Sequence, residues 1–473
     1  ETFLPVKSLN LLAAAWIQFQ AHDWFNHGRD QAGNNLIVEL EDDDPWHEHP
    51  MRIPKTRPDP TRTPDEADLP PTFTNEVSHW WDSSAIYGCD EDTASCVRSR
   101  VDGKLALQNG RLPLDPETGI SITGFNDNWW VGLGLLHTLF TLEHNAICDR
   151  LRREYPQWND DQLYGKARLI NAALMAKIHT VEWTTGILSH PALQIGMRAN
   201  WWGLASERVF KIFGRLSKNE TISGIPGSPV DHHGVPFSLT EEFTSVYRLH
   251  PLIPDDLDIH SLRTGELLKK LTFPEVFGRN AETVVDDKVS VTDVLYSFGI
   301  SHPGAITLHN FPRFLQDITL PDGTRMDLAA VDVLRDRERG VPRYNQFRKL
   351  LHMTPATSFE DLTENKQWAE ELREIYQGDI DRVDLMVGMY AETPPSGFGF
   401  SDTAFRIFIL MASRRLKSDR FFTTDYTPQV YTQAGMDWIA ENGMLDILLR
   451  HYPELAPVLG GVKNAFAPWQ RVG

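Results

Sequence analysis

Apolar residues recur at helical spacing through most of this sequence of 473 residues, whereas alternating strand patterns are few. The first helical segment has Ser8 as a candidate cap, runs through Leu11 and Phe19 towards Asn26, and meets Gly28 as its stop. Further helices are predicted over residues 130–153, from 160 past 179, and over 342–352, 359–376, 401–417, 428–441 and 443–451. These patterns predict a mainly α fold.

Two dipeptides, Asn109-Gly110 and Asp322-Gly323, predict tight turns between short apolar segments, so we expect a few short β-hairpins. Residues 41–71 hold eight prolines and few apolar side chains, which is typical of an extended surface loop rather than of a domain boundary. We expect residues 1–473 to form a single domain. The sequence opens on Glu1, and an apolar helix follows within ten residues, so we expect an N-terminal part to be missing.

The net charge is −19 and no basic block is present, which argues against nucleic-acid binding. No apolar run reaches the roughly 18 residues that a membrane-spanning helix needs. Three cysteines, Cys89, Cys96 and Cys148, exclude a disulfide-rich scaffold. Cys89 and Cys96 could pair, but we expect free thiols.

A glutamine and a histidine lie one helical turn apart in the first helix. Gln18 and His22 share one face of residues 16–24, and the rest of that face is apolar. A polar pair that points into an apolar cavity could lie over a bound cofactor. The alternative is a core histidine that is hydrogen-bonded to a neighbour, and these nine residues alone favour that alternative.

The segment 246–251 combines a tyrosine, a histidine and a proline. Residues 238–241 read as a capping box, with Ser238 as the cap, and Pro251 closes the short helix that follows. Tyr247 and His250 are three residues apart, so both project to one side of this helix. The imidazole could bind iron through Nε2 with the phenol beside the metal, which suits the formation of a tyrosyl radical. The alternative is two ordinary core residues.

Residues 334–348 are dense in arginine beside a helix that starts with Pro342. Guanidinium groups pair with carboxylates, such as the propionates of a porphyrin. A solvated charge cluster explains the same composition equally well.

Together, these three segments resemble the peroxidase–cyclooxygenase superfamily of haem proteins, and most closely its fatty-acid α-dioxygenases. The resemblance runs from Leu9 to Trp469 and includes residues 142–145, which are similar to the family's helix with Glu-His-Asn. The family stretch Arg-Gly-Arg-Asp-His-Gly, followed by a hydrophobic residue and Pro-Gly-Tyr-Asn, is similar to residues 335–345. Here Glu338-Arg339 stands near the usual Asp-His, and Arg343 replaces a Gly. These differences weaken a strict peroxidase assignment more than the haem assignment.

The resemblance implies a haem peroxidase-like, cyclooxygenase-type helical catalytic domain. It implies haem b that is not covalently bound, because Ala21 stands before the distal histidine where haem-esterified relatives carry an acid. It also implies a role for each of several residues: His22 is the distal histidine with Gln18 beside it, His250 is the iron ligand, Asn345 supports the proximal side, Arg348 pairs with a propionate, and Tyr247 forms the radical.

The resemblance further implies where a fatty acid binds. His179 and Thr184 look like the pair that helps to hold the substrate carboxylate. Arg415 looks like the arginine that forms a salt bridge with it, and the adjacent Arg414 is the alternative. In a protein with a net charge of −19, a fatty-acid anion has to be met by a local cation in an apolar channel. Without the resemblance, both arginines read as the end of a surface helix.

Residues 78–84 present oxygen atoms at alternate positions, and Asp23 follows the distal histidine. Hydroxyl, carbonyl and carboxylate oxygens at this spacing suit a hard cation. The segment resembles the family's calcium loop, with Ser78 where the family carries Thr. The resemblance implies a Ca²⁺ site made of Asp23, Ser78, the Trp80 carbonyl, Asp82 and Ser84. A serine-rich turn is the alternative.

The reaction that the resemblance implies is α-dioxygenation of a long-chain fatty acid by O₂, with a peroxide as activator and a 2-hydroperoxy fatty acid as product. Related enzymes take substrate from lipid, so peripheral membrane contact is compatible with it. Three alternatives remain: a haem peroxidase that oxidises small donors with hydrogen peroxide, a dioxygenase that attacks an internal carbon of an unsaturated fatty acid, and a helical binding protein without catalysis.

Overall fold

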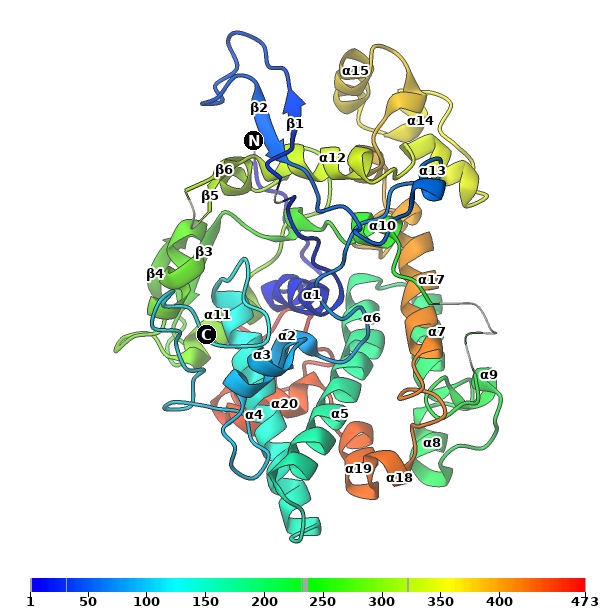
Figure 1. The fold of residues 1–473 in the computed structure, drawn as a ribbon. Coiled ribbons are helices and arrows are strands. Elements are labelled where there is room, and N and C mark those ends of the chain that lie inside the picture. The colour runs from blue at the N-terminus through cyan, green and yellow to red at the C-terminus, as the bar shows by residue number, and fades with distance from the viewer. Residues whose placement is uncertain (1, 31, 231, 233–236, 321–322, 473) are drawn as a thin grey trace.

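The computed structural model describes residues 2–30, 32–230, 232, 237–320 and 323–472. It is mainly helical, with few and short strands (Figure 1). Helix α1 (Leu11–Trp24) lies near the middle of the molecule and contacts α4 (Val131–Glu154) and α11 (Val291–Ile300). The prediction of a mainly α fold with minor hairpins is confirmed.

Helix α1 is buried over almost its whole surface, because every residue except Gln18 and Ala21 is buried. A helix that is buried all round shows no amphipathic stripe in its sequence. Both of its less buried residues line a cavity that is described below. Helix α1 therefore lines the cavity with the part of its surface that the core does not cover.

The start of α1 differs from the prediction. The helix begins at Leu11 after Asn10, so Ser8 is not its cap. The Asn10 side-chain amide instead donates to the carbonyl oxygens of Ala465 (2.7 Å) and Ala467 (2.8 Å). This pair of bonds fixes the start of the central helix to the C-terminal segment, a contact across more than 450 residues that no local pattern announces.

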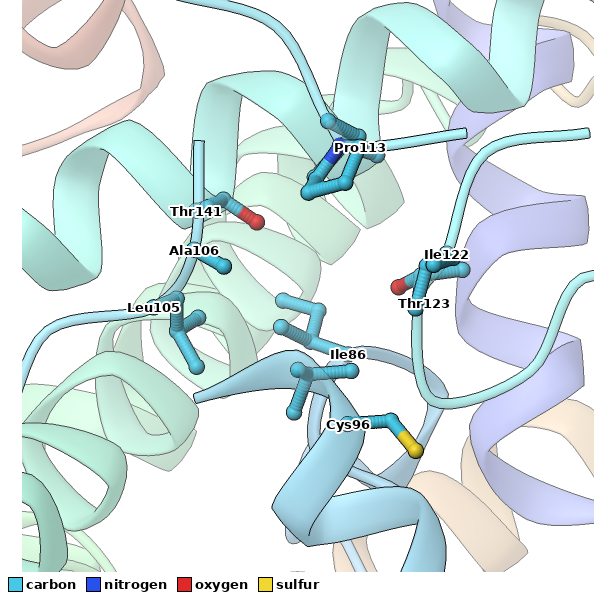
Figure 2. Close-up of a pocket in the computed structure, with 10 residues that line it drawn as sticks. Ile86, Cys96, Leu105, Ala106, Pro113, Ile122, Thr123 and Thr141 are labelled. Atoms are coloured by element: carbon cyan, nitrogen blue, oxygen red, sulfur yellow. The ribbon is translucent and has the colours of Figure 1, made fainter. Parts of the chain in front are cut away.

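Short helices α2 (Ser84–Tyr87) and α3 (Glu91–Val97) follow the predicted calcium loop, and α2 contacts both α1 and α4. Figure 2 shows a small pocket beside them, with Ile86, Thr123 and Thr141 among its lining residues. Its volume is about 10 Å³, which is room for no more than about one water molecule. We interpret this pocket as a packing defect rather than as a ligand site.

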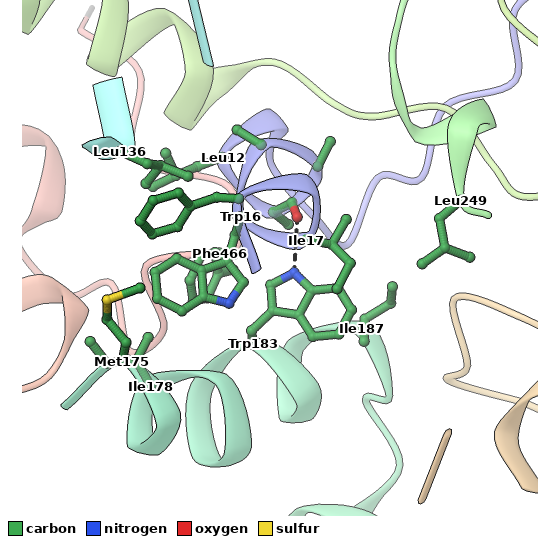
Figure 3. Packing of buried hydrophobic residues seen from close by; sticks show 14 of the residues in the cluster. Leu12, Trp16, Ile17, Leu136, Met175, Ile178, Trp183, Ile187, Leu249 and Phe466 are labelled. Atoms are coloured by element: carbon green, nitrogen blue, oxygen red, sulfur yellow. Dashed lines mark hydrogen bonds between the residues drawn. The ribbon is translucent and has the colours of Figure 1, made fainter. Parts of the chain in front are cut away.

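Large aromatic side chains build the core around α1. The Trp16 ring packs against Phe140 (5.5 Å between ring centres) and Phe466 (5.4 Å). The Trp183 indole donates from Nε1 to the carbonyl oxygen of Ala13 at 2.9 Å (Figure 3). These contacts join the N-terminal, middle and C-terminal parts of the chain in one apolar core.

The long helix predicted from residue 160 past residue 179 is confirmed, but its winding changes. Helix α5 (Asp160–Ile178) starts at a capping box formed by Asn159 and Gln162. A π-helical turn, η2 (His179–Trp183), follows, and α6 (Thr184–Ile187) completes the helix. Such π turns inside helices occur frequently at functional sites.

The helix after the middle of the chain is capped differently from the prediction. Helix α10 (Glu241–Val246) begins after Thr240, whose hydroxyl accepts from the backbone N–H of Phe243, so Ser238 is not the cap. The short helix η4 (His250–Leu252) follows it. Residues 247–249 form a non-helical bend between them, with Tyr247 at the C-cap of α10 and His250 as the first residue of η4. The prediction of one helix that Pro251 closes is therefore wrong, because α10 ends before Tyr247 and Pro251 lies within η4.

Each range predicted from residue 342 onwards contains a helix, but 359–376 and 428–441 are each divided into two helices. The sequence patterns do not predict the helices over 191–202, 207–213, 220–223, 328–338, 385–391 and 456–459. The remaining helices complete the fold. They are α7 (Pro191–Trp202), α8 (Glu207–Phe213), α9 (Glu220–Ser223), α12 (Leu328–Glu338), α13 (Tyr344–Leu350), α14 (Phe359–Leu362), α15 (Lys366–Ile375), α16 (Leu385–Ala391), α17 (Asp402–Ser418), α18 (Pro428–Tyr431), α19 (Gln433–Glu441), α20 (Met444–His451) and α21 (Ala456–Leu459), with the short 3₁₀ helices η1 (Pro64–Glu66), η5 (Phe273–Val276), η6 (Gly278–Thr283), η7 (Arg313–Asp317), η8 (Ile380–Arg382) and η9 (Pro453–Leu455).

Three antiparallel pairs make up the described strands: β1 (Asn35–Val38) with β2 (Met51–Pro54), β3 (Asp256–His260) with β4 (Leu267–Thr272), and β5 (Ile318–Thr319) with β6 (Arg325–Met326). Strand β2 lies within residues 41–71, so the prediction of a loop there is only partly right. Its Met51 and Ile53 side chains are buried against Val331, and this small cluster fixes the otherwise polar segment.

The two predicted turns have different outcomes. Asn109 (φ 51°) and Gly110 (φ 75°) are both left-handed between the paired residues Gln108 and Arg111, which confirms that turn. Asp322 lies outside the described residues, although β5 and β6 flank it. Where the chain is described, all three cysteines are free thiols, and none of its helices has the length and apolar character to cross a membrane.

Candidate active site

A cavity of about 360 Å³ separates α1 from residues 244–253. Gln18 and His22 line it from α1, and Tyr247 and His250 line it from the opposite side. The structure therefore brings together all three segments that the sequence singles out, because Arg335 and Arg339 of residues 334–348 also line the cavity. Its lining is asymmetric: Trp130, Phe273, Phe277 and Leu315 are apolar, whereas His27, Arg29, Thr56, Arg335 and Arg339 are polar or charged.

The α1 side of the cavity carries the hydrogen-bonded side-chain amide of Gln18 and the neutral imidazole of His22. Gln18 Oε1 accepts from Trp130 Nε1 at 2.8 Å, and Gln18 Nε2 donates to the carbonyl oxygen of Asn128 at 3.4 Å. Burial lowers the pKa of His22 to about 4, so its ring is neutral at neutral pH. Among the described residues His22 Nδ1 has no hydrogen-bond partner.

The opposite side carries a histidine bound to a buried carboxylate. His250 Nδ1 lies 2.5 Å from Asp332 Oδ2, and Arg248 Nη1 donates to the other oxygen, Oδ1, at 2.7 Å. Burial opposes ionisation of Asp332, but the nearby His250 and Arg248 hold its pKa below the usual range. Because a carboxylate only accepts, Nδ1 carries the proton of this hydrogen bond, and Nε2 is the ring nitrogen that could bind a metal.

Tyr247 links this cavity to a second group of buried polar residues. It lines the cavity, and its ring stacks on Phe408 (5.3 Å between ring centres) and meets Trp24 edge-on (5.4 Å). Burial raises the pKa of Tyr247 well above the usual range, so the phenol keeps its proton. Within the part of the chain that the structure describes, its hydroxyl has no hydrogen-bond partner.

Arg415 also packs against Trp24. Its guanidinium carbon is 4.2 Å from the centre of the Trp24 ring and 5.0 Å from that of Trp81, and only 3% of the residue is exposed. Nη2 donates to the carbonyl oxygen of His79 at 3.1 Å, and Nε has no partner within the described chain. Burial lowers the pKa of Arg415 to about 10, which still leaves it charged at neutral pH.

His179 is packed against the same two tryptophans, with ring centres 5.2 Å from Trp24 and 5.4 Å from Trp81. Its Nδ1 accepts from Trp16 Nε1 at 3.2 Å, so the proton of the neutral ring is on Nε2. That buried Nε2–H has no partner among the described residues. The Thr184 hydroxyl donates to the His179 carbonyl oxygen at 2.8 Å across the π turn.

The structure therefore separates the two adjacent arginines. Arg414 Nε reaches His232 Nε2 at 3.0 Å, whereas Arg415 faces the tryptophans. Buried polar groups are usually hydrogen-bonded, and a buried donor without a partner costs about 1–3 kcal/mol. Arg415 and His179 together leave two such donors in one apolar cluster. That arrangement fits an anionic acceptor such as a carboxylate.

Two predicted roles do not fit the structure. Asn345 donates to the Ala356 carbonyl oxygen and to Asp381, and Asp332 instead contacts His250, so Asn345 does not support the proximal side. Arg348 does not line the cavity. It donates to Thr403 Oγ1 at 2.6 Å and pairs with Glu392, because α13 directs it towards α16 and α17.

The predicted calcium ligands from two segments lie close together. Asp23 Oδ1 accepts from Ser84 Oγ at 2.9 Å, and Asp82 Oδ1 accepts from the Ser84 backbone N–H at 3.1 Å. Ser78 Oγ accepts from the Trp80 backbone N–H at 3.4 Å. Burial and the facing Asp82 carboxylate hold the pKa of Asp23 well above the usual range.

Asp23 is buried and the Asp82 side chain is 38% exposed, and a cation would relieve the repulsion between these two carboxylates. No group of three or more histidine, cysteine or acidic side chains suited to a metal occurs among the described residues. A site here would depend on two carboxylates together with neutral oxygens, as the sequence predicts.

Sequence reasoning missed Asp332, Trp24, Trp81 and Trp130. Asp332 lies three residues before Arg335, the first charged residue of the arginine-rich segment 334–348. The tryptophans read as ordinary core residues. In each case the functional contact joins segments that are 50 or more residues apart, so no local pattern marks it.

Comparison with known proteins places these features in a family. Residues 1–462 match the sequence model of the animal haem peroxidases. The chain is 40% identical to alpha-dioxygenase PIOX of Oryza sativa over 98% of its length and 76% of that protein, and 39% identical to alpha-dioxygenase 1 of Arabidopsis thaliana over 98% of its length and 74% of that protein.

Solved structures agree with the sequence matches. The crystal structure of Oryza sativa fatty acid alpha-dioxygenase is 38% identical and matches with a TM-score of 0.93 over 99% of this chain and 79% of that one. A tyrosine-to-phenylalanine variant of the same rice protein, solved with palmitic acid, matches with the same TM-score of 0.93. The chain belongs to the animal haem peroxidase family, and within it to the fatty-acid α-dioxygenases.

Proposed function

We propose that this protein adds O₂ to the α-carbon of a long-chain fatty acid and forms a 2-hydroperoxy fatty acid. One observation carries the proposal: the unpaired buried donors of Arg415 and His179 adjoin Trp24, and Tyr247 contacts the same ring. A carboxylate held at these donors has its α-carbon next to the cluster that contains the tyrosine.

The family implies haem, and the cavity fits one. Asp332 binds His250 at Nδ1, which leaves Nε2 to bind the iron. Metal-binding histidines usually donate their other ring N–H to a carboxylate in this way. His22 and Gln18 face it from α1, both on the cavity lining. The apolar residues of the lining, such as Trp130 and Phe273, suit the porphyrin ring, and its arginines suit the propionates.

Arg339 is the candidate propionate partner, in place of Arg348. It is buried, lines the cavity, and makes only long hydrogen bonds: 3.3 and 3.4 Å to Thr56 Oγ1 and 3.3 Å to Glu241. Glu241 is shared with His27, which is closer at 2.8 Å. A guanidinium with such weak partners has donors to offer to an incoming carboxylate.

When bound, haem supplies the oxidising power of a peroxide to this site. Tyr247 then loses the hydrogen of its Oη, and the phenoxyl oxygen takes a hydrogen atom from the substrate α-carbon. O₂ adds to that carbon, and the resulting peroxyl radical takes the hydrogen back from Tyr247 Oη. The net reaction consumes one fatty acid and one O₂, and the tyrosyl radical is regenerated.

Positioning sets the carbon that reacts. Arg415 and His179 hold the carboxylate, the first as a fork of N–H donors and the second through Nε2–H, while Thr184 fixes the π turn that presents His179. The flanking Trp24, Trp81 and Phe408 rings exclude water from the charged pair. Fixing a reactant in this way accounts for a large part of enzymatic acceleration.

Calcium is the second proposed ligand. Asp23, Asp82 and the oxygens of Ser78, Trp80 and Ser84 would hold it, and the elevated pKa of Asp23 supports a site that is relieved by positive charge. Arg415 donates to the His79 carbonyl oxygen within this same loop. A cation there would fix both the start of the loop and the guanidinium that meets the substrate.

Peripheral membrane contact has support in residues 195–222. Six large apolar side chains in this segment are exposed: Ile195, Leu204, Ile212, Phe213, Leu216 and Ile222. The same segment carries five basic and two acidic residues in a chain whose net charge is −19. Exposed apolar residues beside basic ones favour an anionic phospholipid surface, which is also a source of fatty acid.

Oxygen uptake by the haem-loaded protein with palmitate and a trace of peroxide tests the function, with products identified by mass spectrometry. We expect 2-hydroperoxypalmitate or pentadecanal. Palmitate has no bis-allylic hydrogen, so turnover of linoleate alone would favour attack at an internal carbon. Oxidation of guaiacol by hydrogen peroxide without oxygen uptake would favour a peroxidase.

A further inference from the structure

Asp332 is fixed from two directions beside the histidine that faces the cavity. Its side chain is 1% exposed, and its two oxygens bind different partners, Oδ2 the His250 ring and Oδ1 the Arg248 guanidinium. Arg248 and His250 belong to the same short segment as Tyr247. One carboxylate on α12 therefore holds the whole segment that lines this side of the cavity.

The hydrogen bond is short and has a defined direction. The distance between His250 Nδ1 and Asp332 Oδ2 is 2.5 Å, shorter than the roughly 2.7–2.9 Å that is usual for a charge-assisted N–H···O hydrogen bond. The carboxylate cannot donate, so the proton lies between Nδ1 and Oδ2 and the ring gains electron density. A neutral amide partner, which the sequence led us to expect from Asn345, would leave the ring much less polarised.

The other charged groups near this contact do not compete for the His250 proton. Asp336 Oδ1 accepts from Ser245 Oγ at 2.5 Å and lies 3.6 Å from Arg248 Nε. The Tyr390 hydroxyl donates to the Arg248 carbonyl oxygen. Of the described carboxylates, Asp332 alone is hydrogen-bonded to His250.

We propose that Asp332 is a positioning residue that makes His250 a strongly donating iron ligand and so lowers the reduction potential of the bound haem. Hydrogen bonds from a ligating histidine to a carboxylate raise ligand basicity, and such contacts are a principal means of adjusting haem potentials. The inference rests on the proposed ligation by His250.

The expected consequence suits the proposed reaction. A lower potential favours ferric over ferrous iron. Ferric haem does not bind O₂, so O₂ remains available for the carbon radical beside Tyr247. Asp332 would thus separate the use of peroxide at the iron from the use of O₂ at the substrate.

The experiment compares the haem-loaded wild type with Asp332→Asn and, as a matched control, Asp336→Asn, which removes a nearby carboxylate that does not contact His250. The iron–histidine stretch of the ferrous protein is measured by resonance Raman spectroscopy, and the reduction potential by spectroelectrochemistry. In Asp332→Asn we expect the stretch at lower frequency and the potential more positive. We expect Asp336→Asn to keep the wild-type stretch.

An unmoved stretch and potential in Asp332→Asn would overturn the inference and leave ligation by His250 intact. Absence of an iron–histidine stretch from the wild type would instead overturn the ligation itself. If Asp332→Asn does not retain haem, the wild-type stretch is compared with that of ferrous haem with 2-methylimidazole. A higher frequency in the protein supports the inference, and an equal or lower one overturns it.

Discussion

The guanidinium of Arg415 lies 4.2 Å from the centre of the Trp24 ring, and Tyr247 meets the same ring edge-on at 5.4 Å. The proposed carboxylate partner and the proposed radical residue thus contact the same indole and belong to one aromatic cluster. Trp24 follows Asp23 directly in the sequence. Asp23 belongs to the proposed calcium site, and Trp24 contacts both Arg415 and Tyr247. The three proposed sites therefore meet at two consecutive residues at the end of α1.

Replacing the buried arginine tests the carboxylate site. Arg415→Ala should lower kcat/KM for palmitate about 10- to 100-fold, because a hydrogen bond to a charged group is worth about 1.5–3 kcal/mol. Attack should also spread to other carbons, which product analysis by mass spectrometry would reveal. Arg414→Ala is the matched control, since Arg414 turns to His232. If only the Arg414 variant loses activity, the carboxylate site has to be moved to that residue.

Removing one oxygen atom tests the radical. Tyr247→Phe should abolish oxygen uptake with palmitate while the Soret absorption stays, because the ring packing on Phe408 and Trp24 does not involve the hydroxyl. The hydroxyl makes no hydrogen bond within the described chain, so the free energy of unfolding should change little. Wild-type oxygen uptake by this variant would rule out the radical role. Retained guaiacol oxidation would show that the haem still reacts with peroxide.

The sequence predicts the helices well where the apolar spacing is regular. The ranges 401–417 and 443–451 correspond closely to α17 (Asp402–Ser418) and α20 (Met444–His451). It is weaker at helix starts, because tertiary contacts decide them. Ser8 carries a suitable side chain, yet the helix begins where the Asn10 amide binds the C-terminal segment. Local propensity is a weak guide against such long-range contacts.

The site residues divide in the same way. Tyr247 and His250 face one cavity because three-residue spacing on a short bend is a local property. Arg348 also lies on a predicted helix, but whether its side chain faces the cavity depends on how α13 packs against α16. In the structure this side chain binds Glu392 and Thr403 instead. Asp332 reaches His250 across 82 positions of sequence. No pattern read along the chain contains that contact.

The raised pKa of Asp23 predicts a dependence on pH and calcium. An acid whose pKa is higher in the folded than in the unfolded state makes folding take up a proton, so stability falls as pH rises above the ordinary range of a carboxyl, about 4. In the chelated protein, the melting temperature should therefore be lower at neutral pH than at mildly acidic pH because of this group. Calcium should offset this loss, because at a free concentration of 100 times its Kd it raises the free energy of unfolding by about 2.7 kcal/mol.

Differential scanning fluorimetry with EGTA or calcium at the two pH values measures this effect. Asp23→Asn should weaken both the pH dependence and the gain from calcium, whereas Asp30→Asn, a change to an exposed carboxyl in the next segment, should leave both in place. Equal melting temperatures with and without calcium in the wild type would remove the proposed cation site.

The exposed residues of α8 predict lipid binding. The double change Ile212→Ser and Phe213→Ser should reduce binding to vesicles of phosphatidylcholine with phosphatidylserine by at least about tenfold, because burial of each large apolar side chain contributes about 1.5–3 kcal/mol. Flotation measures binding, and high salt should weaken it. Ile375→Ser, at an equally exposed position on α15, is the control. Unchanged flotation of the double variant would assign this surface to something other than lipid.

Haem titration distinguishes the two candidate propionate partners. Arg339→Gln should weaken haem binding about 10- to 100-fold, since Arg339 lines the cavity and its present hydrogen bonds are no shorter than 3.3 Å. Arg348→Gln should have a much smaller effect, because its side chain is occupied by Thr403 and Glu392 outside the cavity. Haem dimethyl ester, which lacks the negative charges, should bind the wild type less tightly than haem does. The Arg339 variant should bind the ester and haem about equally well. If only the Arg348 variant fails to prefer haem over the ester, Arg348 is the propionate partner.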